Sequence, residues 1–195
     1  MKVIDISMTI SPDMEMYPGE PGPVITRISK LESGDQYNVS QLILGTHTGT
    51  HVDPPLHLIE GGAGIDDMPL DMLVGPARVI DLSHIQNDIE PADIGDVEPG
   101  EILLLKGKEG GVRLTTAVAQ YLMDNGIKTV GTDALSIGAA GEEYEVHTVL
   151  LGADIAVVEG LVLSAVEAGQ YLFVCLPLKV ATGDGGPARV VLIEQ

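Results

Sequence analysis

Apolar residues occur along the chain in short runs that alternate with polar positions and predict a series of β-strands. Glycine and proline separate the early runs, with Pro12 and the segment 18–23 between the first two, and they mark turns there. The predicted strands are Val3–Ser7, Val24–Ser29, Val39–Leu44, Ala77–Leu82, Ile102–Lys106, Lys128–Gly131, Ile155–Glu159, Tyr171–Leu176 and Arg189–Ile193.

Helical spacing of apolar residues is clearest from about Thr116 to Asn125. Val118, Tyr121 and Leu122 form an apolar stripe there, a threonine precedes it as a cap, and a glycine follows it where helices commonly end. A second, short helix is predicted to start around His147. Since strands prevail in the first half and alternate with helices in the second, the order predicts a mixed α/β domain with helices packed on a sheet.

The composition supports a single globular domain spanning residues 1–195. The chain has a mass of 20.5 kDa, 45% of its residues are hydrophobic, and no linker, repeat or low-complexity tract divides it. Aromatic residues make up only 3%, so the core must be built mainly from aliphatic side chains.

The net charge and the cysteine content limit which partners the protein can bind and in which cellular compartment we expect it. With 29 acidic against 10 basic residues, the net charge of −19 repels nucleic acid and anionic membranes, although bound divalent cations would reverse the local field for an anionic substrate. Cys175, the only cysteine, lies in an apolar run and is interpreted as a core residue in a reducing compartment. We find no signal-peptide or transmembrane pattern and expect a cytoplasmic protein that acts on a small molecule.

Four potential metal ligands crowd the segment 45–57. These are His47, His51, Asp53 and His57, in a chain with only five histidines. Histidine and aspartate are favoured ligands of zinc and manganese where no thiolate is present. The alternative is a set of loop histidines held by hydrogen bonds, but their density favours a metal-dependent active site.

The same segment disfavours a helix, although His47 and His51 have the spacing of one helical face. Its glycines, threonines and the Pro54-Pro55 pair are poor helix formers, and in a regular strand these two histidines would lie about 13 Å apart. We therefore predict an irregular bend after the strand that ends at Leu44, with Gly49 supplying the bend.

Two further donors stand later in the chain. Glu159 interrupts the apolar run of a predicted strand, where an unpaired carboxylate is costly to bury, and His147 lies twelve residues earlier. A cation held by both side chains would explain the glutamate, whereas a solvated strand end with a surface histidine is the alternative. His84 has no such neighbours in the sequence and is interpreted as a surface or capping residue.

The run from His47 to His57, His-Thr-Gly-Thr-His-Val-Asp-Pro-Pro-Leu-His, resembles the HxGTHxDxPxH signature of the cyclase family. That family includes bacterial kynurenine formamidase (arylformamidase) and isatin hydrolase. The likeness runs nearly end to end and includes Asp5-Ile-Ser, Tyr17-Pro-Gly, Gly131-Thr-Asp-Ala-Leu-Ser, the pair His147 and Glu159, Leu176-Pro-Leu-Lys and Gly183-Asp-Gly-Gly-Pro-Ala-Arg.

The resemblance implies a particular fold, a set of metal ligands and a homo-oligomeric state. The fold is a swivelling β/β/α domain, and members commonly form homo-oligomers, so a dimer or tetramer is expected. Asp53 is placed to bridge two ions, and zinc is favoured by its intrinsic affinity, with manganese as the alternative. The implied ligands of this binuclear site are His47, His51, Asp53, His147 and Glu159.

The implied activity is hydrolysis of the C–N bond of a small amide. The leading reactions are N-formylkynurenine to kynurenine and formate, as in tryptophan catabolism, and opening of an isatin-like lactam. A divalent ion activates water and polarises the carbonyl, and His57 resembles the general acid/base of the family. A lactone hydrolase, a cyclase or dehydratase, and a metal-binding module without turnover are the alternatives.

Tyr17 is the candidate substrate-binding residue. In kynurenine formamidases its position is typically Trp, which helps to hold the aromatic substrate, and here the residue differs but is still aromatic. The alternative is a proline-flanked turn residue without ligand contact.

Overall fold

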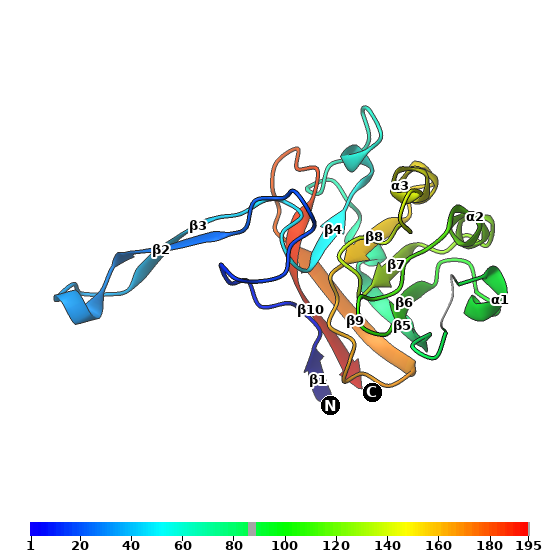
Figure 1. Cartoon of the computed structure of the whole chain (residues 1–195), viewed down its shortest axis with the longest axis horizontal. Helices are drawn as coiled ribbons and strands as arrows, with labels where there is room; N and C mark the ends of the chain where they lie inside the picture. The colour runs from blue at the N-terminus through cyan, green and yellow to red at the C-terminus, as the bar shows by residue number, and fades with distance from the viewer. Residues whose placement is uncertain (86–88, 195) are drawn as a thin grey trace.

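The computed structural model describes residues 1–85 and 89–194, and its centre is a sheet of seven strands closed on itself (Figure 1). The order around the sheet is β10-β4-β8-β7-β6-β5-β9, with β9 pairing again with β10, and β1 lies along the free side of β10. The seven strands of the closed sheet are β4 (His51–Asp53), β5 (Val74–Asp81), β6 (Ile102–Lys106), β7 (Thr129–Thr132), β8 (Ala156–Glu159), β9 (Gly169–Pro177) and β10 (Gly186–Glu194), and the added strand is β1 (Lys2–Asp5).

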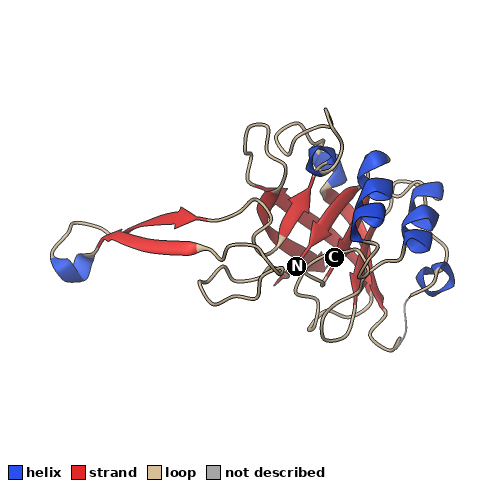
Figure 2. Cartoon of the chain, turned by 45° about the horizontal axis from the view of Figure 1, so that its top comes forward, coloured by secondary structure: helices blue, strands red, loops and turns tan. Residues whose placement is uncertain are grey.

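In residues 1–85 and 89–194, three α-helices cover the outside of the parallel part of the sheet (Figure 2). Strands β5, β6, β7 and β8 pair in parallel, and one helix stands in each connection between them, as parallel pairing requires a crossover. These helices are α1 (Pro91–Ile94), α2 (Thr116–Asp124) and α3 (Glu143–Gly152). Short 3-10 turns occupy Leu31–Ser33, Pro55–His57 and Leu70–Met72.

Strand β6 is buried on both faces and divides two apolar clusters. Leu103 and Leu105 face the helices, whereas Ile102 and Leu104 face the interior of the closed sheet. Alternation of side chains along the strand explains why this run is continuously apolar. The interior also holds Cys175, which is fully buried, and burial raises the pKa of its thiol, so the core interpretation of this cysteine is confirmed.

A separate hairpin projects from the closed sheet (Figures 1 and 2). It is formed by β2 (Val24–Ser29) and β3 (Val39–Ile43), which pair with each other in a separate antiparallel sheet of two strands. The two chain ends lie beside each other, since the register pairs Lys2 with Glu194.

The mixed α/β prediction is confirmed, and most predicted elements are present. Strands β2 and β6 have the predicted bounds, and helix α2 begins after Thr115, whose hydroxyl accepts the N–H of Val118 at 3.4 Å. The prediction that a helix starts around His147 was wrong, because α3 begins at Glu143 and carries His147 within it. Helix α1 was not predicted.

The early start of α3 follows from packing. Residues 143–145 have no apolar stripe, so the pattern gives no signal there. The helix is held by Val146, Leu150 and Leu151, which are buried in the core. In the part of the chain that the structure describes, no helix combines the length and apolar character needed to span a bilayer.

Candidate metal centre

The segment after β3 bends back before it enters the closed sheet. Residues 44–50 form no strand, and Gly49 has a φ of +69°, a left-handed value that favours glycine, so the predicted bend is confirmed. The predicted irregularity ends sooner than expected, because His51–Asp53 form the regular short strand β4 between β10 and β8. The hydroxyl of Thr50 donates to the carbonyl of Gly160 at 2.5 Å and ties the bend to the end of β8.

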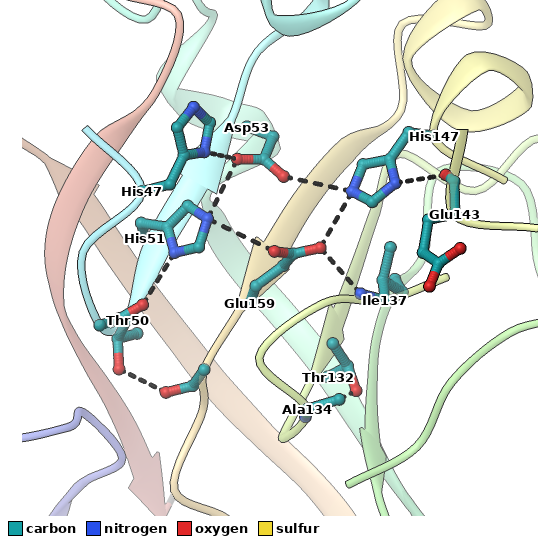
Figure 3. A network of polar contacts seen from close by, with 12 residues as sticks. His47, Thr50, His51, Asp53, Thr132, Ala134, Ile137, Glu143, His147 and Glu159 are labelled. Carbon is teal, nitrogen blue, oxygen red and sulfur yellow. Dashed lines mark hydrogen bonds and ion pairs between the residues drawn. The ribbon is translucent and has the colours of Figure 1, made fainter. Parts of the chain in front are cut away.

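Strands β4 and β8 bring one imidazole and two carboxylates together (Figure 3). His51 and Glu159 are direct cross-strand partners, and Nε2 of His51 lies 3.4 Å from Oε2 of Glu159. The same nitrogen lies 3.2 Å from Oδ1 of Asp53, two residues along β4. Nδ1 of His51 donates to the carbonyl of Gly49 at 2.8 Å, which leaves Nε2 directed at the carboxylates.

His147 reaches the same carboxylates from helix α3 (Figure 3). Its Nδ1 donates to the carbonyl of Glu143 at 2.7 Å, and its Nε2 lies 3.0 Å from Oε1 of Glu159 and 3.7 Å from Oδ2 of Asp53. The backbone N–H of Ile137 donates to Oε1 of Glu159 at 2.8 Å and fixes that carboxylate from the other side. The predicted proximity of His147 and Glu159 is therefore observed.

His47 completes the cluster from the bend. Its Nδ1 lies 2.8 Å from Oδ1 of Asp53, and its Nε2 lies 3.6 Å from Oδ2 of Asp184. The ring packs against Gly185, where an added Cβ would lie 2.7 Å from Cε1 of His47. Asp184 and Gly185 were not singled out from the sequence, and the only signal was that both stand in the Gly183-Asp-Gly-Gly motif.

A cavity of about 270 Å³ opens over the cluster. His57, at the end of the 3-10 turn after β4, lines it with its ring centroid 4.3 Å from that of His47 and 5.9 Å from that of His147. Tyr17 also lines the cavity and is 40% exposed, and Tyr144 of α3 contributes a second aromatic side chain. His84 is exposed and does not line this cavity.

The buried groups of the cluster perturb one another strongly. Burial by itself lowers the pKa of His147, but the carboxylates of Asp53 and Glu159 outweigh it and raise the pKa to about 10. Burial also lowers the pKa of His51, but the same two carboxylates outweigh it and raise this pKa well above its usual value. Burial would raise the pKa of Asp53, yet the surrounding histidines, His51 first, hold it well below the ordinary range.

The donor atoms meet the requirements of a divalent metal site. Among the described residues, the buried side-chain atoms without a hydrogen-bond partner include Nε2 of His47, Nε2 of His51 and Oδ2 of Asp53. Two sets of three side chains have ligand atoms within 4.8 Å of one another, and Asp53 belongs to both; the sets are His47, Asp53 and His57, and His51, Asp53 and Glu159. Imidazole and carboxylate donors of this kind suit zinc or manganese, so the residues fit a metal.

Comparison with known proteins gives a consistent result. The family described as "Putative cyclase" matches residues 4–139. Kynurenine formamidase of Salinibacter ruber is 37% identical over 98% of this chain and 97% of its own length. A solved structure described as a potential metal-dependent hydrolase with cyclase activity is 36% identical, with a TM-score of 0.88 over 98% of this chain and 96% of that chain. Isatin hydrolase A of Labrenzia aggregata shares the fold, with 23% identity and a TM-score of 0.86 over 100% and 94% of the two chains.

A closed mixed sheet that gathers histidines and carboxylates beneath a cavity defines, together with these relatives, a metal-dependent hydrolase. The chain belongs to the cyclase family, and the resemblance drawn from the His47–His57 signature is confirmed.

Proposed function

We propose that this chain hydrolyses the C–N bond of a small-molecule amide, with formamides of the N-formylkynurenine type as the leading substrates and isatin-like lactams as the second class. One observation carries the proposal. Asp53 belongs to two sets of metal-ligand side chains that lie beside a cavity large enough for a small aromatic molecule. The 37% identity to a kynurenine formamidase over nearly the full length of both chains supports the formamide class.

The proposed ligands are the five residues whose donor atoms converge in the cluster, and we propose two zinc ions, with manganese as the alternative. Asp53 would bridge the ions, because its two oxygens face different histidines, Oδ1 toward His47 and His51 and Oδ2 toward His147. When bound, such ions supply a Lewis acid that acidifies water and polarises a carbonyl group. The proposed ligand set is His47, His51, Asp53, His147 and Glu159.

His57 is the proposed general acid/base. Burial lowers the pKa of its imidazole below the usual value, so the neutral form prevails at pH 7 and can accept a proton from the attacking water. The ring of His57 lines the cavity next to His47. In this position the imidazole nitrogen that accepts the proton can return it to the departing amine. Since His57 also has a donor atom near those of His47 and Asp53, its role must be separated from ligation by experiment.

The apolar lining of the cavity is proposed to hold the organic part of the substrate. Tyr17, Tyr144, Leu58 and Leu135 contribute this lining, which suits an aromatic ring. Tyr17 is accordingly the proposed substrate-binding residue. Its side chain is partly exposed, which allows the phenol to contact a bound ring.

The remaining parts of the proposal concern the whole protein. We propose that residues 1–195 act as one domain, since the full-length relatives align over almost the entire chain. A homo-oligomer in a reducing compartment such as the cytoplasm is also proposed. The single buried cysteine is consistent with that compartment.

Elemental analysis combined with a substrate panel tests the function. The purified protein should contain zinc or manganese, lose activity with a chelator and regain it with the metal, and cleave N-formylkynurenine or formanilide faster than isatin or a simple lactone. His51→Ala should lose both metal and activity, whereas His84→Ala, which alters an exposed histidine outside the cluster, should keep both. Preferred turnover of lactones, or bound metal without turnover of any compound, would contradict the amide assignment.

A further inference from the structure

The proposed ligand role of His47 uses only one of its two ring nitrogens. Nδ1 lies 2.8 Å from Oδ1 of Asp53, whereas Nε2 is, among the described residues, one of the buried side-chain atoms without a hydrogen-bond partner. A neutral imidazole that gives one nitrogen to a metal carries its proton on the other. With Nδ1 as the donor to the metal, the N–H of Nε2 therefore needs an acceptor.

Asp184 places a carboxylate oxygen beside that nitrogen. Its Oδ2 lies 3.6 Å from Nε2 of His47, and its Oδ1 accepts the hydroxyl of Thr46 at 2.9 Å. A shift of about 0.5 Å would bring Oδ2 into the range of a hydrogen bond. The side chain of Asp184 is 56% exposed and has room for this shift. Thr46 therefore fixes one oxygen of the carboxylate, and the other oxygen faces the next residue in the chain.

The backbone that leads to Asp184 is tied to a neighbouring loop. The N–H of Thr182 donates to Oδ1 of Asp66 at 2.9 Å. The N–H of Ile65 donates to the carbonyl of Gly183, also at 2.9 Å. Because both contacts precede Asp184 directly, they define where its side chain starts.

This segment is also strained and tightly packed. Thr182 has a φ of +50°, a left-handed value that a β-branched residue rarely adopts. Such conformations persist where the surrounding structure imposes them, and they cluster at functional sites. On the other side of Asp184, an added Cβ at Gly185 would lie 2.7 Å from Cε1 of His47. The chain is therefore held in a shape that sets Asp184 and its backbone against the imidazole.

We propose that Asp184 is a positioning residue, which accepts the N–H of Nε2 of His47 and so directs Nδ1 toward a metal beside Asp53. A carboxylate in this place fixes the orientation of a ligating imidazole and makes its other nitrogen a better donor. Thr46 holds the carboxylate in turn. The inference rests on the proposed function, because it takes His47 as a metal ligand.

Zinc affinity, measured by competition with a chromogenic chelator, tests the role of Asp184 without any substrate. Asp184→Ala should bind zinc about 10- to 100-fold more weakly than the wild type. Asp184→Asn, whose amide oxygen still accepts an N–H, should have an affinity between the two. Asp67→Ala, which changes an exposed aspartate elsewhere on the surface, should bind zinc as the wild type does.

The outcomes separate this inference from the proposed function. A wild type that binds zinc, together with an Asp184→Ala variant of the same affinity, overturns the positioning role and leaves the ligand set intact. A wild type that binds no zinc overturns both.

Thr46→Val tests whether the hydroxyl acts through Asp184. The variant keeps the shape of the side chain and removes the donor to Oδ1, so zinc affinity should fall, by less than in Asp184→Ala. The double variant should bind zinc within about twofold of Asp184→Ala alone, because groups that act through one contact are not additive. Fully additive losses would contradict the assignment of Thr46 to Asp184.

Nitrogen-15 NMR of the histidine rings gives a readout that a merely structural role would not move. In the zinc-loaded wild type, His47 should carry its proton on Nε2, and this N–H should be protected from exchange with water. In Asp184→Ala the signal should broaden or disappear, whereas the N–H of His51, which donates to the carbonyl of Gly49, should be unchanged. A proton on Nδ1 of His47 in the loaded wild type overturns the proposal.

Discussion

His51 and Glu159 face each other directly across the antiparallel strands β4 and β8, with Nε2 of the histidine 3.4 Å from Oε2 of the glutamate. Asp53 stands two residues further along β4 and on the same face, so register alone brings three donors together. The strand pair forms a rigid floor, and His47 and His147 reach it from the bend and from α3. Sites built on regular elements hold their ligands in defined positions.

Asp53→Asn should remove more metal than any other single substitution in the cluster. The side chain contacts both sets of donors, and an amide cannot replace a bridging carboxylate. We expect metal affinity to fall by at least about 100-fold, beyond the range seen when only supporting hydrogen bonds are lost. Elemental analysis after dialysis measures the loss, with Asp13→Asn at an exposed loop position as the control. Full metal content in Asp53→Asn would remove this residue from the site.

His57→Ala should keep its metal and lose turnover. General acid/base groups contribute roughly 10² to 10⁴-fold to rate, so kcat/KM should fall within that range. Because burial lowers the pKa of His57, activity of the wild type should decline on the acid side below pH 6.5, and this limb should be absent from the variant. A variant that loses metal instead would show that His57 is a ligand, as its distance from His47 and Asp53 also allows.

The metal-free protein should lose stability as pH rises from about 6.5 to 10. In this state the pKa of His147 is about 10, against the ordinary 6.5 of an unfolded histidine. Its protonated ring stabilises the fold fully below 6.5, and this contribution disappears as pH rises through 10. We expect the Tm of chelator-treated protein to fall by at least about 5 °C over that interval.

His147→Gln provides the comparison for this pH dependence. Its Tm should fall less steeply, but still fall, because the pKa values of His51 and His47 are also raised. Identical slopes for both proteins would mean that His147 does not carry the raised pKa.

Gly185→Ala should weaken metal binding without unfolding the protein. An added Cβ would lie 2.7 Å from the ring of His47, so the imidazole must shift and its 2.8 Å contact with Asp53 is disturbed. We expect metal affinity to fall by about 10-fold or more, as for other changes that shift a ligand. Gly75→Ala is the matched control, since its nearest neighbour would be Nζ of Lys128 at 3.5 Å. Equal affinity in the two variants would show that His47 tolerates displacement.

Much of the fold was predictable because local patterns and packing agree. The cap at Thr115 and the apolar stripe of α2 predict the same helix. The continuous apolar run of β6 predicts a strand, and both faces of that strand are buried. Strand β4 was not recognised as a strand, because its three residues follow glycine and threonine and precede two prolines. Its conformation is set by pairing with β8 and β10, which are more than 100 residues away in sequence.

The candidate site was predictable where donors cluster in sequence, and less so where the fold assembles them. The spacing of His47, His51 and Asp53 was visible directly, whereas Glu159 was noticed only because a carboxylate interrupts an apolar run. Asp184 and Gly185 carry no such pattern. They reach His47 because β10 pairs with β4, and periodicity does not reveal this long-range pairing.

Anomalous diffraction from crystals of zinc-loaded protein tests whether the cluster around Asp53 binds two ions. We expect two zinc peaks, one on either side of the carboxylate of Asp53, each at about 2.0–2.2 Å from nitrogen or oxygen donors of the five proposed ligands. Peaks only elsewhere on the molecule, or no bound zinc at the cluster of His51 and Glu159, would contradict it.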